Sequence, residues 1–184
     1  MLCQFTKDGE YPTLADLEIK LPKDVYPLGR LDTDSEGLLI LSNDKKLNNL
    51  LLEPSMKHKR TYYAQVEGTP APDKLKELCD GVVININGEN YKTQPCTAKQ
   101  IDEPALAERN PPIRYRKNVP VTWIELTLTE GKNRQVRKMT AKVGYPTLRL
   151  VRASIENLTL ANMEPGEVIE LDKKKLYSLL KIKG

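Results

Sequence analysis

The segment VYPLGRLDTDSEGLLILS, residues 25–42, joins two apolar runs through a polar turn. Residues 25–31 favour an extended strand, and the apolar run GLLILS at 37–42 predicts a buried strand. The intervening DTDSEG, residues 32–37, is rich in Asp, Ser and Gly, which is typical of a tight turn between strands. This segment therefore predicts a strand, a turn and a second strand, with several carboxylates on the turn.

The rest of the chain alternates predicted strands with short helices. Residues 42–44 are cap candidates for a helix that Pro54 ends, and Pro72 and Gly81 bound another helix. The proline-rich stretch 102–120 predicts a long loop, and long loops in compact domains are usually functional or disordered. Strands outnumber helices and mostly connect by short turns, so we expect an α+β fold with a mixed, mostly antiparallel sheet and flanking helices. The other expected elements are strands at 59–68, 82–87, 91–101, 121–131, 148–160 and 167–172, and helices at 45–53, 73–79, 134–143 and 173–183.

Length and composition favour one compact unit. A chain of 184 residues with 39% hydrophobic residues suits one domain, or two closely packed lobes that share a core. No segment approaches the ~20 apolar residues needed to cross a bilayer, and the start MLCQFTKDGE lacks the layout of a secretory signal. Cys3, Cys79 and Cys96 are odd in number and lack metal-ligand spacing, so we expect reduced thiols in a cytoplasmic protein.

Basic residues are unevenly distributed along the chain. The net charge is only +4, but residues 129–153 contain seven Lys and Arg residues against one acid, Glu130. Smaller basic clusters occur at 57–60 and 114–117. Phosphate neutralisation supplies most non-specific affinity for nucleic acids, so the asymmetry predicts a polyanion-binding face. Charge alone leaves an ordinary solvated surface as the alternative.

The motif GRLDTDSEG is compatible with three kinds of site. Asp32 and the next two acids stand at positions one, three and five of a calcium loop, but Asn43 replaces the required Glu at position twelve and the flanks predict strands. A second possibility is a polar turn whose residues serve the backbone. A third is a catalytic carboxylate: Arg30 and Asp32 share one side of an extended strand, and a neighbouring cation favours the ionised form. The motif alone does not decide between turn and catalyst.

A basic helix and a tyrosine pair are the other candidate features. Arg134 and Arg137 are three residues apart on one face of a predicted helix, which either faces phosphates or is solvated. Tyr62 and Tyr63 point to opposite faces of a predicted strand, so one can face a cleft and stack on an unpaired base, or both can be half-buried. His58 is the only histidine, which argues against a Ser/His triad and a zinc site. Neither GxGxxG nor GxxxxGK[ST] is present.

Three ordered motifs resemble those of the RNA pseudouridine synthases, in the branch typified by the small-subunit enzyme A. They are GRLDTDSEGLLILSND, KRTYYAQVEG and EGKNRQVRKMTAKVGYPTLRLVR, and together they cover nearly the whole chain. Within that branch, RNPPIRYRKNVPVTWIELTL is similar to short members that act on large-subunit ribosomal RNA. The resemblance implies a pseudouridine synthase fold in which two lobes share one sheet around a central catalytic cleft. It also implies one catalytic domain over 1–184, with no separate N-terminal RNA-binding domain.

The resemblance assigns roles residue by residue. Asp32 matches the catalytic aspartate, and Arg30 matches an arginine that helps to displace the target base. Tyr62 matches a tyrosine that stacks on the flipped uracil, and Arg137 matches the basic residue that pairs with the aspartate. Leu148 is similar to an apolar residue beneath the base. We expect the basic residues of 129–153 to contact flanking phosphates, namely Lys132, Arg134, Lys138 and Arg149.

The implied reaction breaks the glycosidic bond of uridine and rejoins uracil through carbon 5, without a metal or organic cofactor. Asp32 could attack the anomeric carbon or assist removal of the neighbouring ribose proton, and the sequence does not choose. The uridine must first be flipped from its stack, at a cost of a few kcal/mol. We expect a monomer that acts on ribosomal RNA, by resemblance that of the large subunit, and no membrane partner. The alternatives are a non-catalytic RNA-binding or ribosome-associated module, a synthase acting on another RNA, and a glycoside hydrolase that pairs Asp32 with Asp34 or Glu36.

Overall fold

The computed structural model describes residues 1–182 apart from 18, 115 and 117, and of Pro54 only the backbone. Two members of the predicted basic cluster at 114–117 therefore lie outside the described residues. In chain order the elements are η1 (Leu14–Leu17), β1 (Tyr26–Leu28), β2 (Glu36–Gly37), β3 (Ile40–Ser42), α1 (Lys45–Leu52), η2 (Pro54–Met56), β4 (Arg60–Glu67), α2 (Pro72–Asp80), β5 (Val83–Ile86), β6 (Glu89–Lys92), β7 (Thr97–Ile101), β8 (Val121–Leu128), α3 (Gln135–Lys142), β9 (Thr147–Ile155), β10 (Leu158–Thr159) and α4 (Lys173–Leu179).

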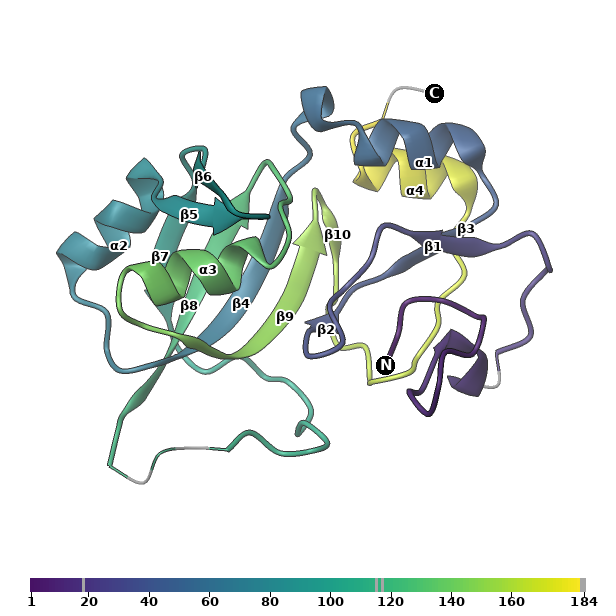
Figure 1. Cartoon of the computed structure of the whole chain (residues 1–184). Helices are drawn as coiled ribbons and strands as arrows, with labels where there is room; N and C mark the ends of the chain where they lie inside the picture. Colours follow the sequence, from purple (N-terminus) through teal and green to yellow (C-terminus); the bar gives the residue numbers. More distant parts are fainter. Residues whose placement is uncertain (18, 115, 117, 183–184) are drawn as a thin grey trace.

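The main sheet has six strands, ordered β10-β9-β4-β8-β7, with β2 added to β9 (Figure 1). The β2–β9 pairing is parallel and the other pairings are antiparallel. Strand β4 lies in the middle of this sheet, where Tyr62 is opposite Leu126 of β8 on one side and Arg152 of β9 on the other. The predicted α+β fold, with a mixed and mostly antiparallel sheet, is confirmed.

The molecule has two lobes, each with its own core. In the sheet lobe, α2, α3 and the β5–β6 hairpin pack on the main sheet around buried residues such as Ile124, Leu126 and Met139 (Figure 1). In the N-terminal lobe, β1, β3, α1 and the C-terminal helix α4 enclose a second core. The expected single sheet through both lobes is interrupted, because β1 and β3 form a two-stranded sheet of their own. Among the described strands, the short β2 extends this part of the chain into the main sheet, and Ile155 of β9 belongs to the second core.

Four predicted strands differ from those observed. The run 148–160 is divided into β9 and β10 by a tight turn in which Glu156 has a positive φ of 50°, and the two strands pair antiparallel. The run 37–42 is divided, because β2 pairs with β9 whereas β3 pairs with β1. At Gly37 φ is +106° and a Cβ atom would clash with the backbone of Arg152, so β2 approaches β9 this closely only with glycine. The run 91–101 is divided into β6 and β7 at Pro95, which has no N–H for a ladder. Residues 167–172 form no strand, and 167–170 are exposed with no described strand beside them.

The predicted cap of α1 also joins the two terminal parts of the chain. Oδ1 of Asp44 accepts hydrogen bonds from the backbone N–H groups of Lys46 (3.0 Å) and Leu47 (3.2 Å). Oδ2 accepts from the hydroxyl of Tyr177 (2.8 Å) and lies 2.8 Å from Nζ of Lys173. One carboxylate therefore caps α1 and fixes α4 against it. In the described part of the chain, every helix is too short or too polar to span a lipid bilayer.

Replacing Asp44 by Ala is expected to lower the free energy of unfolding by about 1–2 kcal/mol, the usual effect of losing an N-cap. The contacts with Lys173 and Tyr177 lower the pKa of Asp44 well below its ordinary value. A depressed pKa in the folded state stabilises the protein above the unfolded-state pKa, near 3.9, and this stabilisation is lost as pH falls further. Urea unfolding at pH 7 and at pH 3 measures both effects. Asp44→Asn is the control, since it retains the cap but loses the charge. The wild-type protein should have a larger free energy of unfolding than Asp44→Asn at pH 7, and the difference should shrink at pH 3. An equal difference at the two pH values would contradict the ionic contribution.

Candidate active site

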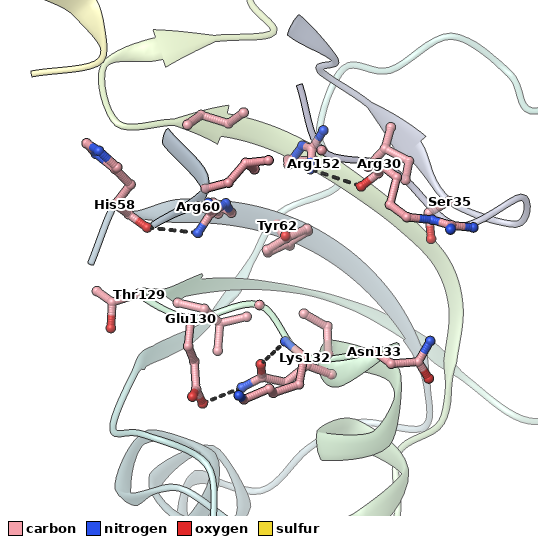
Figure 2. A pocket seen from close by; sticks show the side chains of 18 of the residues that line it. Arg30, Ser35, His58, Arg60, Tyr62, Thr129, Glu130, Lys132, Asn133 and Arg152 are labelled. Carbon is pink, nitrogen blue, oxygen red and sulfur yellow. Dashed lines mark hydrogen bonds between the residues drawn. The ribbon is translucent and has the colours of Figure 1, made fainter. Parts of the chain in front are cut away.

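A cavity of about 570 Å³ lies between the two lobes. The segment after β1, residues 29–36, forms one wall, and β4 and β9 form the floor. The segment 128–136, which leads into α3, forms the opposite wall. Figure 2 shows Tyr62 between Arg30 and Arg152 on one side and Lys132 and Asn133 on the other. The two walls come from segments about 100 residues apart in the chain. A hydrogen bond between Asp34 and Arg134, which are 100 residues apart, joins these segments.

Asp32 lies on the wall of this cavity, with its side chain 28% exposed. Its Oδ2 is 3.7 Å from a terminal nitrogen of Arg134, which approaches from the segment before α3. Arg30, Tyr62 and Lys132 line the same cavity, Arg30 and Lys132 being exposed and Tyr62 half-buried. Five of the nine predicted site residues are therefore brought together. Tyr63, which faces the other side of β4, is not among the lining residues.

Asp34 is the carboxylate with the stronger ionic contacts. Arg134 donates two hydrogen bonds to it, at 2.9 and 2.8 Å, in a bidentate arrangement. Nε of Arg137 is 3.4 Å from its Oδ2. The hydrogen bonds from Arg134, with the charge of Arg137, lower the pKa of Asp34 below its ordinary value against a smaller effect of burial. Asp34 therefore stays ionised and ties the turn to α3.

We expected Arg137 to pair directly with Asp32, but in the structure it contacts Asp34. Arg137, whose side chain is 12% exposed, contacts Asp34 and donates hydrogen bonds to the carbonyl oxygens of Asp34 (2.7 Å) and Thr147 (3.2 Å). Burial lowers the pKa of this guanidinium, and Asp34 opposes that effect. The reason lies at Arg134, which precedes α3 with a left-handed backbone (φ 51°). This conformation places Arg134, rather than Arg137, between the two aspartates.

The other predicted residues lie outside the central cavity. Leu148 and Arg137 line a second cavity beside it, and Arg134 lines both. Leu150, two residues further along, is the leucine of β9 that lines the central cavity. Arg149 is paired with Glu36 at 2.8 Å, and Nζ of Lys138 donates to Oδ1 of Asn133 at 3.3 Å. Residues two apart on a strand share a face, so the motif alone does not say which of the two leucines reaches the central cavity.

Arg152 is a site residue that the sequence analysis did not single out. It is 5% exposed, and Nε donates to the carbonyl oxygen of Leu38 (2.8 Å) while a terminal nitrogen donates to that of Arg30 (3.4 Å, Figure 2). One guanidinium therefore joins the two ends of the turn that carries Asp32. Burial lowers the pKa of Arg152, and the adjacent Tyr62 acts in the opposite direction. A buried arginine on a strand has no sequence signature beyond its place in the alternation, so this role was not predictable.

The wall opposite Asp32 is ordered by Glu130. Its carboxylate accepts hydrogen bonds from the hydroxyl of Tyr91, the backbone N–H of Gln94 (2.8 Å) and the side-chain amide of Gln135 (2.6 Å). The bond to Glu130 raises the pKa of Tyr91 to about 12. Nζ of Lys132 lies 5.0 Å from the centre of the Tyr91 ring. Glu130, the single acid of the segment 129–153, thus has a structural role, and the nearby Lys132 lines the cavity.

The geometry disfavours two of the alternative sites. The motif 29–37 is flanked by strands rather than by the helices of a calcium loop. Asp34 and Glu36 both form ion pairs with arginines. Arg109 and Arg149 contact Glu36, so neither acid is free to work beside Asp32 as a second hydrolytic carboxylate. Among the described residues, no group of three His, Cys, Asp or Glu side chains could bind a metal ion.

The chain is similar to known proteins in both sequence and fold. A family model described as RNA pseudouridylate synthase matches residues 1–142. Ribosomal large subunit pseudouridine synthase E of Vibrio parahaemolyticus is 47% identical over 171 residues, or 92% of this chain and 69% of that protein. The protein of that name from Xanthomonas campestris pv. campestris is 46% identical over 168 residues, or 91% of this chain and 88% of that protein. A crystal structure of a pseudouridylate synthase has the same fold, with a TM-score of 0.76 at 22% identity over 97% of this chain and 68% of that chain.

Proposed function

Since this chain belongs to the RNA pseudouridylate synthase family, we propose that it converts a uridine of large-subunit ribosomal RNA to pseudouridine, with Asp32 as the reacting carboxylate. The observation that carries the role of Asp32 is its position in the inter-lobe cavity, 3.7 Å from Arg134 and lining the same space as Tyr62. The choice of RNA follows the names of relatives that are 46–47% identical. The motifs also resemble the branch typified by the small-subunit enzyme A, but neither of the two relatives described above carries that name. A ribosomal RNA substrate implies a cytoplasmic enzyme.

Substrate binding in this proposal begins with base flipping. The target atoms of uridine are inaccessible in a stacked helix, so the nucleotide must enter the cavity, at a cost of a few kcal/mol. The ring of Tyr62 is a stacking surface for the extruded uracil, worth about 1–3 kcal/mol. Arg30, exposed at the rim, is placed to fill the gap left in the RNA, and Lys132 contacts a flanking phosphate. The charge of these residues favours the RNA backbone.

The chemistry requires an ionised carboxylate at Asp32, and the charge of Arg134 favours that form. In one route a carboxylate oxygen bonds to the anomeric carbon while uracil leaves with the electron pair of the glycosidic bond. In the other route the carboxylate removes the neighbouring ribose proton while uracil leaves with the electron pair of the glycosidic bond, which gives a glycal. In both, uracil rotates and carbon 5 bonds to the anomeric carbon. At that step the bond from Asp32 to the anomeric carbon breaks in the first route, and the ribose carbon regains its proton in the second. Carbon 5 then loses its hydrogen, and nitrogen 1 gains a proton. The product is an isomer of the substrate.

Arg137 and Arg152 act on Asp32 through the backbone. Arg137 contacts both the carboxylate and the carbonyl oxygen of Asp34, two residues after Asp32. Arg152 contacts the carbonyl oxygens of Arg30 and Leu38, on the two sides of it. The turn is therefore fixed at three points. In this proposal both arginines are positioning residues, and Arg134 supplies the counter-charge of Asp32.

Replacing Tyr62 by Phe tests whether its hydroxyl takes part in proton transfer. The variant retains the stacking surface, so we expect unchanged RNA affinity and a kcat lowered by about 100-fold, in the range of general acid–base effects. Single-turnover rates and equilibrium RNA binding measure the two quantities. Tyr63→Phe is the matched control, because it removes the same hydroxyl from the opposite face of β4 and should leave kcat unaltered. A near-normal kcat for Tyr62→Phe would confine this residue to stacking.

The proposed substrate is tested by incubating the protein with purified large-subunit ribosomal RNA, small-subunit ribosomal RNA and transfer RNA. Nucleoside analysis after digestion should detect new pseudouridine in the large-subunit RNA alone. Mapping pseudouridines in ribosomal RNA from cells with and without the protein then identifies the nucleotide. New pseudouridine only in one of the other RNAs would overturn the substrate and leave the reaction intact.

A further inference from the structure

A second cavity, of about 480 Å³, lies beside the central one, and four arginines are among its lining residues. We call it the arginine cleft. Arg134 and Arg137 come from the start of α3, and Arg109 and Arg114 come from the long segment between β7 and β8. The remaining lining residues are Asp34, Pro112, Ile113, Pro146, Thr147 and Leu148. The cleft therefore combines positive charge, which attracts a phosphate, with an apolar wall, which can contact a sugar or a base.

Positive charge exceeds negative charge in and around the cleft. Its four arginines, with the neighbouring Arg149, are accompanied by Asp34, Glu36 and, on the far side of Arg134, Asp32. Arginines thus outnumber carboxylates by two. Burial is the main cause of the lowered pKa of Arg137, and the positive charges of Arg134 and Arg109 lower it further, so these guanidinium groups repel one another. A bound anion would relieve this repulsion.

The long segment is fixed against the turn that carries Asp32. Nε of Arg109 lies 3.1 Å from Oε1 of Glu36, and Arg149 binds the same carboxylate through two hydrogen bonds, at 3.1 and 2.8 Å. Arg149 also donates to the carbonyl oxygen of Ala107 (2.9 Å). Arg114, in contrast, is exposed, and none of the described residues forms an ion pair with it. The segment is therefore held in place at Ala107 and Arg109, and Arg114 lines the cleft without an ion pair to any described residue.

We propose that the arginine cleft is a second RNA subsite, which binds the phosphate and sugar of a nucleotide next to the flipped uridine. The inference rests on the proposed function for the identity of the RNA. Arg134 lines both cavities, and Asp34 in the cleft is two residues from Asp32 in the central cavity, so a single strand can pass from one to the other. Arg114 contacts the phosphate, and Ile113 and Leu148 contact the sugar or base. Residues 109–114 thereby contribute to substrate choice without touching the reacting atoms.

Arg114→Ala tests the subsite by equilibrium binding to large-subunit ribosomal RNA at several salt concentrations. We expect binding to weaken about five- to tenfold, as for the loss of one charge-assisted phosphate contact. The slope of log K against log salt should fall by about 0.7, the value for one phosphate of a single strand. Arg116→Ala is the matched control: it removes an exposed arginine from the same segment, but Arg116 is paired with Glu67 at 3.3 Å and does not line the cleft.

The control separates a specific subsite from a general effect of charge. Arg116→Ala should bind RNA within twofold of the wild-type protein. Equal losses in the two variants, or wild-type binding by Arg114→Ala, would overturn the subsite. Pseudouridine formation by the wild-type protein is measured on the same RNA. If that reaction fails while only Arg114→Ala loses affinity, the proposed function is wrong and the cleft remains an RNA-binding site.

Discussion

Replacing Asp32 by Asn is expected to lower the rate of pseudouridine formation by more than about 1000-fold, because an amide neither attacks the anomeric carbon nor removes a ribose proton. The change alters one atom and preserves the shape of the side chain. Asp34 retains its contacts with Arg134 and Arg137, so the turn should remain in place. Pseudouridine is measured by nucleoside analysis under single-turnover conditions with large-subunit ribosomal RNA.

The affinity of Asp32→Asn for RNA distinguishes a chemical role from a binding role. We expect it to lie within about threefold of the wild-type value, because Arg30, Lys132 and Arg134 are all retained. Asp34→Asn is a useful companion variant, since it removes the carboxylate that is two residues away and paired with both arginines. It should lower the rate less than Asp32→Asn does. Substantial turnover by Asp32→Asn would refute the role assigned to Asp32.

Replacing Arg137 by Ala is expected to lower kcat by about 100-fold, through displacement of the turn rather than loss of a direct contact with Asp32. Arg137 is nearly buried and has three contacts that join α3, the turn and β9. Lys142, an exposed residue of the same helix, is the matched control, and Lys142→Ala should alter kcat less than twofold. Single-turnover rates at saturating RNA measure the difference.

A conservative variant separates positioning from simple destabilisation. Arg137→Lys retains the charge but loses the forked geometry that reaches two carbonyl oxygens, so it should recover only part of the rate. Thermal unfolding of both variants shows whether they are folded at the assay temperature. Equal rates for Arg137→Ala and Lys142→Ala would show that the contacts of Arg137 are irrelevant to the reaction.

Local patterns predicted most of the fold. The cap at Asp44, the period-two strand at 121–128 and the helix before Gly144 are visible in a few consecutive residues, and the structure contains them. Pairings that depend on distant residues were not visible. The division of 37–42 between two sheets depends on how closely β9 approaches Gly37, which no local pattern encodes.

The site was predictable to the extent that motifs converge. Arg30 and Asp32 stand in one motif and Tyr62 in another, and the resemblance placed them in one cleft, as the structure does. The choice between Arg134 and Arg137 as partner of Asp32 depended on a left-handed residue at the start of α3. Arg152 was missed because burial of a charged side chain is a property of the folded sheet.

The central claim is that an aspartate in the inter-lobe cavity breaks and reforms the bond between uracil and ribose. Release of tritium from ribosomal RNA labelled at carbon 5 of uracil follows that event directly, since this hydrogen departs only when the new bond forms. The wild-type protein should release tritium in step with pseudouridine, and Asp32→Asn should release none. Wild-type protein that binds the labelled RNA but releases no tritium would contradict the account.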